Sequence, residues 1–311
     1  MADISSSIYA ETQKFGPYQV NKTYAHVQFR LGQEERALYE KAFWLWLPQI
    51  LSGLHVFRLT GGEPLLAKAF WQTLKLLKAQ ENPKLTLAIN SHFSHPAALI
   101  AKLTEELQRL SGKRSVQYIE IYVSLDTQGL QAEYIRFGLD YQLVLQNIRR
   151  VARVLPEIKF VIMCTFNLLS FDHFHDLIHD LIELKESGVS ISIDISCLRE
   201  PQYLRADLAD QEMKAKWKLV LNKMESHELF SEHERTKARA ADAFIHRPKT
   251  PEFLSQHRGD FYRFVTEYDR RKSLDFRKAF PKYQNFLNRC YKEALVETGS
   301  FLRNSPNCGT V

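Results

Sequence analysis

The chain has 311 residues, a formal charge of +6 and a sequence pI near 9.0, with 45% hydrophobic and 25% charged residues. This is an ordinary soluble globular composition, and the charge excess is too small to indicate a nucleic-acid partner. No apolar run approaches the roughly 18 residues of a membrane span, and the amino terminus lacks a basic region followed by an apolar signal core. We therefore expect a cytoplasmic protein with no membrane partner.

Helix-like and strand-like segments alternate from about residue 36 to residue 196. The strand-like runs are short, apolar and bounded by polar or turn residues, as buried parallel strands are. In chain order the pattern predicts helix 34–50, strand 54–59, helix 65–80, strand 84–90, helix 95–111, strand 117–125, helix 139–155, strand 158–165, helix 171–187 and strand 189–196. This alternation indicates an α/β fold with a parallel sheet.

The pattern changes after Cys197, because residues 207–300 are typical of helices with no strong strand among them. We therefore predict two parts. Residues 1–200 would form the α/β core, and residues 201–311 a mainly helical carboxyl-terminal extension that packs on it.

The motif Thr-Gly-Gly-Glu-Pro-Leu-Leu occupies residues 60–66, between a predicted strand and a predicted helix. Gly61 and Gly62 allow positive φ and close approach of a ligand to the backbone. Pro64 fits the first turn of the following helix, where a missing N–H costs nothing. Glu63 would then face the mouth of the fold. Alone, the motif could also be an ordinary strand-to-helix turn.

Further polar residues lie at or just beyond the ends of the later strands, where closure of a barrel would gather them around Glu63. They are Asn90, Ser124, Asp126, Arg136 and Thr165. Together they offer a carboxylate for an ammonium group, a guanidinium for a carboxylate, and short polar groups for hydroxyls. Each could alternatively be a helix cap, a salt-bridge partner or, for Asp126, part of a turn.

The tetrapeptide Gly61-Gly62-Glu63-Pro64 after a strand resembles the S-adenosylmethionine-contacting motif of radical S-adenosylmethionine enzymes. Segments 85–91, 122–126 and 160–167 resemble the third, fourth and fifth strands of that family, in order. Within that family, the sequence is most similar to the twitch domain-containing members. The similarity is carried by the segments FRLTGGEPLL, SLDTQGLQAEYIRFGLD and ISIDISCLREP. The resemblance covers most of the chain and implies a partial (β/α)6 TIM-like barrel that lacks its first strand.

The resemblance also implies how the cofactor would bind. Gly61, Gly62 and Glu63 would contact the methionyl amino group of S-adenosylmethionine. Ser124 and Arg136 would approach its carboxylate, with Asp126 and Asn90 nearby. In that family a reduced [4Fe–4S] cluster cleaves the cofactor, and the resulting radical removes a hydrogen atom from the substrate.

This chain has no C-x-x-x-C-x-x-C motif to hold such a cluster. Its cysteines are Cys164, Cys197, Cys290 and Cys308, and none has ligand spacing. Met1–Ser7 and Phe15–Tyr18 resemble the stretch directly after the cluster loop in the family. We therefore expect a truncated radical enzyme that is inactive alone, with the cluster and its reductant needed only by a full-length form. The alternative is a cluster-less protein that binds S-adenosylmethionine or a nucleotide. The substrate, a peptide or a small molecule, is not identified.

Two other groups of residues could carry chemistry. His173, His175 and His179 suggest a metal site, but the apolar stripe of the same segment leaves them on its polar side, and we predict no metal there. The basic and aromatic stretch 258–278 could bind phosphates and stack bases. Packed helices give the same composition, and we favour that explanation.

Overall fold

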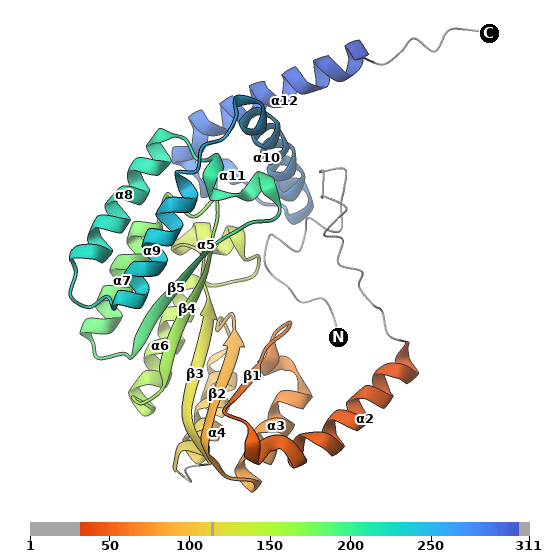
Figure 1. Ribbon diagram of the computed structural model, residues 1–311, viewed down its shortest axis with the longest axis vertical. Helices are drawn as coiled ribbons and strands as arrows, with labels where there is room; N and C mark the ends of the chain where they lie inside the picture. The colour runs from red at the N-terminus through yellow and green to blue at the C-terminus, as the bar shows by residue number, and fades with distance from the viewer. Residues whose placement is uncertain (1–31, 113–114, 305–311) are drawn as a thin grey trace.

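The computed structural model describes residues 32–112 and 115–304, with side chains described up to residue 295. Its centre is a five-stranded, all-parallel sheet (Figure 1). The strands follow one another in chain order: β1 Val56–Leu59, β2 Asn82–Ser91, β3 Val116–Ser124, β4 Lys159–Phe166 and β5 Ile191–Cys197. The prediction of an α/β fold with a parallel sheet is thereby confirmed.

Four helices connect successive strands: α3 Lys68–Ala79, α4 Ala97–Gly112, α6 Tyr141–Val154 and α7 Phe174–Glu186. Parallel crossovers are right-handed, so an unbroken strand order places these helices on one face of the sheet. Alternate residues of β3, such as Ile119, Ile121 and Val123, are buried beneath them. The residues between, including the 61% exposed Tyr118, lie on the opposite face, which no helix of the described ranges covers as α3, α4, α6 and α7 cover the first; we call it the open face.

Most element boundaries lie within three residues of those that the sequence predicts, and three helices show features that it does not predict. The predicted helix 65–80 begins as a short 3-10 helix, Pro64–Leu66, before α3 starts at Lys68. A seven-residue helix, α5 Gly129–Ile135, lies where no element was expected. The helix α2 Gln33–Ile50 forms as predicted, but it projects from the sheet and buries only Leu47 (Figure 1).

The chain after β5 is helical, as the sequence predicts: α8 Gln211–Ser226, α9 Glu232–Ile245, α10 Pro251–Lys272, α11 Phe276–Ala279 and α12 Gln284–Asn304. Helices α10 and α11 lie beyond the carboxyl end of the sheet (Figure 1). The indole of Trp217 lies 4.6 Å from the ring of Phe166, and the hydroxyl of Tyr283 donates to the carbonyl of Leu168 at 2.9 Å. One hydrophobic core therefore continues from the sheet into these helices.

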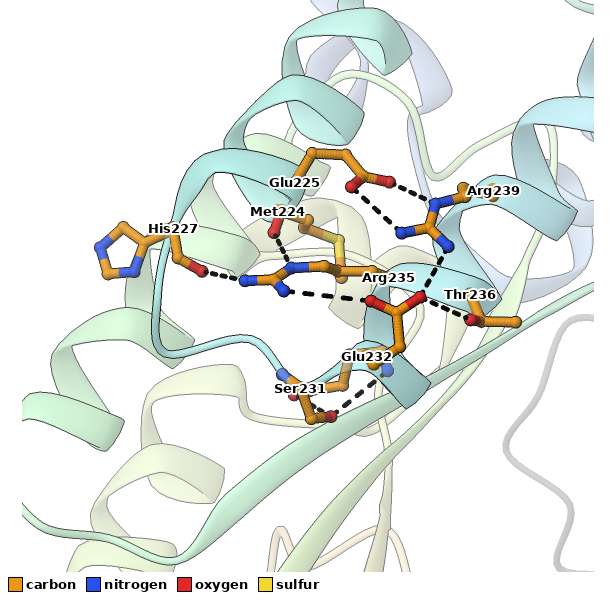
Figure 2. Close-up of polar contacts among 9 residues, drawn as sticks. Met224, Glu225, His227, Ser231, Glu232, Arg235, Thr236 and Arg239 are labelled. Carbon is orange, nitrogen blue, oxygen red and sulfur yellow. Dashed lines mark hydrogen bonds and ion pairs between the residues drawn. The ribbon is translucent and has the colours of Figure 1, made fainter.

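Helix α9 covers the free edge of β5. The amide of Ile193 donates to Glu234 Oε1 at 3.1 Å, and Lys185 Nζ lies 2.9 Å from the same oxygen. Figure 2 shows the outer side of the α8–α9 junction, where Arg239 bridges Glu225 and Glu232 and Arg235 donates to two carbonyls that end α8. At the β5 edge of the sheet, a side chain of α9 therefore accepts a hydrogen bond from the strand. At the other edge, β1 pairs only with β2 among the described strands.

The basic and aromatic stretch 258–278 contributes mainly to packing. Phe261, Phe264, Tyr268 and Phe276 are buried, and the buried guanidinium of Arg258 donates to the carbonyl of Leu208. The rings that could have stacked on bases are therefore core residues. Across the described ranges, no helix is long and apolar enough to cross a membrane.

Candidate functional site

The Gly-Gly turn after β1 has the backbone conformation that its sequence suggests. Gly61 has φ +97° and Gly62 has φ +52°, a region that side chains disfavour. Both residues are exposed, and a Cβ atom added to either would meet no atom within 4 Å. Pro64 takes the first position of the 3-10 helix that follows. The turn therefore offers open backbone at the carboxyl end of the sheet.

Glu63 is buried below this turn instead of facing the mouth of the fold. Only 1% of its side chain is exposed. Its Oε1 accepts from the amide of Leu65 at 3.3 Å, which caps the 3-10 helix, and its Oε2 accepts from the amide of His92 at 3.0 Å. The carboxylate thus joins the turn after β1 to the turn after β2.

Two imidazoles that the sequence analysis did not select complete the surroundings of Glu63. The Nε2 atom of His95 lies 3.2 Å from Oε1, and the Nε2 atom of His92 lies 3.4 Å from Oε2. The two rings are 4.3 Å apart between centroids. The side chain of His95 is 4% exposed and that of His92 is 25% exposed, so the cluster is closed on one side and reachable on the other.

The turn that carries these histidines is held from two directions. Phe93, between them, has φ +59°, which is rare for a residue with a large side chain. Its amide donates to Ser91 Oγ at 2.9 Å. Asn147 of α6 donates to the carbonyls of Phe93 and His95 at 3.0 and 2.9 Å. The surrounding fold therefore fixes a strained turn and with it both imidazoles.

Burial and the neighbouring charges shift the pKa values of Glu63 and His92. Burial alone would raise the pKa of Glu63, but the neighbouring imidazoles of His95 and His92 and the His92 amide outweigh it and lower that pKa. The pKa of His92 is also lowered, chiefly by burial, with Glu63 opposing the shift and the charges of His95 and Arg136 adding to it. A carboxylate beside a neutral imidazole is thus the favoured state at neutral pH.

The predicted residues beyond β3 and β4 form a second cluster. Arg136 NH2 lies 3.0 Å from Oδ2 and 3.1 Å from Oδ1 of Asp126, whose side chain is buried. The amide of Thr165 donates to Asp126 Oδ1 at 2.8 Å. The structure therefore brings Asp126, Arg136 and Thr165 into contact with one another, with the carboxylate and guanidinium already paired, whereas the sequence led us to expect them around Glu63.

Asn90 and Ser124 lie on the open face of the sheet rather than in either cluster. Asn90 Oδ1 accepts from Arg58 at 3.3 Å, and the Arg58 guanidinium lies 4.0 Å above the ring of Tyr122. Ser124 ends β3 and lies in register with Met163 of β4. The selected residues thus share one end of the sheet but form separate sets.

The described cysteines lie apart from both clusters. Cys164 and Cys290 are buried and Cys197 is half-buried, and none belongs to a group of three metal-ligand side chains. Burial raises the pKa of Cys197 to about 12 and that of Cys164 well above its ordinary value. Cys308, Met1–Ser7 and Phe15–Tyr18 lie outside the described residues.

The sequence does carry a signal for the cluster of Glu63, His92 and His95. The segment Ser91-His92-Phe93-Ser94-His95 directly follows β2, and a His-x-x-His pair at the carboxyl end of a parallel strand lies at the edge where Glu63 also lies. Of the histidines predicted not to bind a metal, His175 and His179 lie exposed on α7, and the half-buried His173, at its N-cap, lies 2.7 Å from Asp176 Oδ2.

Comparisons with known proteins give no match: no family model, no curated protein and no solved structure is similar to this chain.

Proposed function

We propose that the carboxyl end of the sheet binds S-adenosylmethionine, on a partial barrel of the radical S-adenosylmethionine type. The observation that carries the proposal is the exposed Gly61-Gly62 turn, whose positive φ angles and unobstructed backbone suit close approach of a ligand. Backbone polar groups there would meet the methionyl amino group. The ligands of α/β proteins commonly bind at this end of parallel strands.

The sheet topology supports the barrel part of the proposal. Five parallel strands in chain order, with their crossover helices on one face, are the arrangement that an opened barrel would have, and they favour it over a doubly wound sheet. A doubly wound sheet reverses its strand order at a switch point. In the proposed complex, Arg136 and Ser124 would approach the carboxylate of the ligand, for which the 11% exposed Arg136 side chain would have to share its contact with Asp126.

The described residues do not fit a [4Fe–4S] cluster. Such a cluster needs thiolates, and the described cysteines are dispersed and held as thiols by burial. The proposed function of this chain is therefore binding. Radical chemistry, with hydrogen-atom abstraction from an unidentified substrate, would belong to a form that supplies a cluster. The alternative is a protein that binds a nucleotide without radical chemistry.

Calorimetric titration of S-adenosylmethionine into the full chain tests the proposal. Gly62→Val places a side chain on the open backbone at φ +52°, and we expect the affinity to fall at least about tenfold, equivalent to about 1.4 kcal/mol. Gly53→Val is the matched control, because a Cβ at Gly53 also meets no atom within 4 Å but the residue lies away from the turn.

Thermal unfolding of each variant separates a loss of binding from a loss of folding. Equal affinities for the parent, Gly53→Val and Gly62→Val chains, or no heat of binding by the parent at millimolar ligand, would contradict the proposal. Binding of ATP in preference to S-adenosylmethionine would favour the nucleotide-binding alternative.

A further inference from the structure

We infer that Glu63, His92 and His95 form a binding site for a divalent transition-metal cation such as Zn2+. Each residue offers one ligand atom, and the three atoms lie within 4.8 Å of one another. Two imidazoles and one carboxylate form a ligand set that zinc and iron(II) accept in proteins. The sequence analysis assigned none of these residues to a metal.

The distances between the imidazole nitrogens and Glu63 are compatible with a shared cation. Ligands at about 2.0–2.1 Å from a tetrahedral zinc ion lie roughly 3.3–3.4 Å from each other. The nitrogen–oxygen distances of 3.2 and 3.4 Å to the two oxygens of Glu63 agree with that separation. Each imidazole nitrogen thus lies about as far from its nearest Glu63 oxygen as two ligands of one zinc ion lie from each other.

The buried nitrogen of His95 gives independent support. Its Nε2 atom lies beside Oε1 of Glu63, yet it makes no hydrogen bond of acceptable geometry within the described part of the chain. A buried polar atom without such a bond costs about 1–3 kcal/mol. A cation bonded to this nitrogen would remove that cost.

His92 would have to change one contact in order to coordinate. Its Nδ1 accepts from the amide of Ser94 at 3.1 Å, which in a neutral ring leaves the proton on Nε2, the atom that faces Glu63. Coordination through Nε2 moves that proton away and breaks the contact with Ser94. His95 and Glu63 therefore contribute most of the affinity, and His92 is the weaker ligand.

Three protein ligands leave the cation an open position, as in catalytic zinc sites. The partly exposed side chain of His92 marks the side from which a water molecule or another ligand would reach it. The inference is independent of the proposed function, because neither the geometry nor the test below involves S-adenosylmethionine.

The test uses the full chain, stripped with a chelator and dialysed against micromolar Zn2+. We expect about one Zn2+ per chain by elemental analysis, and a thermal midpoint that rises with Zn2+ and returns with the chelator, since a cation that binds the folded state stabilises it. Co2+ should give the visible absorption of a four- or five-coordinate site.

Three variants identify the ligands. Glu63→Gln and His95→Asn should lower the Zn2+ affinity at least about 100-fold, and His92→Asn should lower it less. His179→Asn is the control, because His179 belongs to another close group, with Asp180 and Glu183, that is mostly exposed on α7. This variant should keep the affinity of the parent.

Two results would overturn the inference: a parent chain that retains no Zn2+ or Co2+, or His95→Asn and His92→Asn chains that both bind as tightly as the parent. Unfolding of the chelator-treated variants shows whether each is folded. If His95→Asn does not fold, His92→Asn, at the more exposed position, decides the outcome.

Discussion

At the scale of single residues, Asn147 shows how one buried amide can position a site on another element. It is fully buried in α6, and its Nδ2 donates to the carbonyls on either side of the strained turn at Phe93 and His95. Its Oδ1 accepts from Arg150 at 2.9 Å. Together with the bond from the Phe93 amide to Ser91 Oγ, these contacts hold Phe93 at φ +59°.

We predict that Asn147→Ala lowers the free energy of unfolding by about 1–3 kcal/mol, since it leaves two buried carbonyls without their donor. Denaturant titration measures this change. Gln146→Ala, at an exposed position of the same helix, is the control and should change the stability little. A stability unchanged by Asn147→Ala would mean that the turn holds its conformation without α6.

At the scale of secondary-structure elements, α9 takes the place that a further strand would occupy beside β5. Its first-turn residue Glu234 is 1% exposed and contacts the Ile193 amide, Lys185 Nζ and both the amide and the hydroxyl of Ser231. One carboxylate therefore completes the helix cap and pairs an edge amide of the sheet. An edge paired in this way is protected from association with other strands.

We predict that Glu234→Gln lowers the free energy of unfolding by about 3 kcal/mol or more, because it leaves Lys185 as an uncompensated charge that is 10% exposed. Denaturant titration of the variant measures the loss. Glu232→Gln is the matched control on the same turn (Figure 2), since its side chain is 68% exposed and pairs with Arg239 at the surface. Equal losses for both variants would mean that Glu234 does not stabilise the edge of β5.

The elements that the sequence predicted best are those with a continuous apolar pattern. All five strands and the helices between them form within a few residues of their expected limits, because burial on one or both faces dictates their composition. Helix α5 was missed because it is only seven residues long, begins at Gly129 and is soon followed by Gly138, and glycines at positive φ are typical of loops.

At the scale of the whole molecule, the sequence predicts where the polar groups gather but not how they pair. Parallel strands end at one edge, so Glu63, Asp126 and Thr165 were expected near one another there. Their partners depend on tertiary packing. Arg136 forms an ion pair with Asp126, and His92 and His95 contact Glu63. The His-x-x-His pair after β2 marks a polar group at that edge, but the pattern of either segment alone does not show that the pair contacts Glu63.

The distribution of cysteines over the whole molecule leads to the last prediction. Cys164 lies in β4, Cys197 at the end of β5 and Cys290 in α12, and burial raises the pKa of each thiol. A [4Fe–4S] cluster requires several thiolates around one centre. We therefore predict that anaerobic reconstitution of this chain with iron and sulfide yields no stoichiometric cluster, measured by iron and sulfide content and by visible absorption. If the chain binds iron without sulfide, and the His95→Asn variant does not, the iron occupies the proposed metal site at Glu63 instead. One cluster per chain, abolished by Cys164→Ala or Cys197→Ala, would require strands β4 and β5 to rearrange and would contradict the sheet described above.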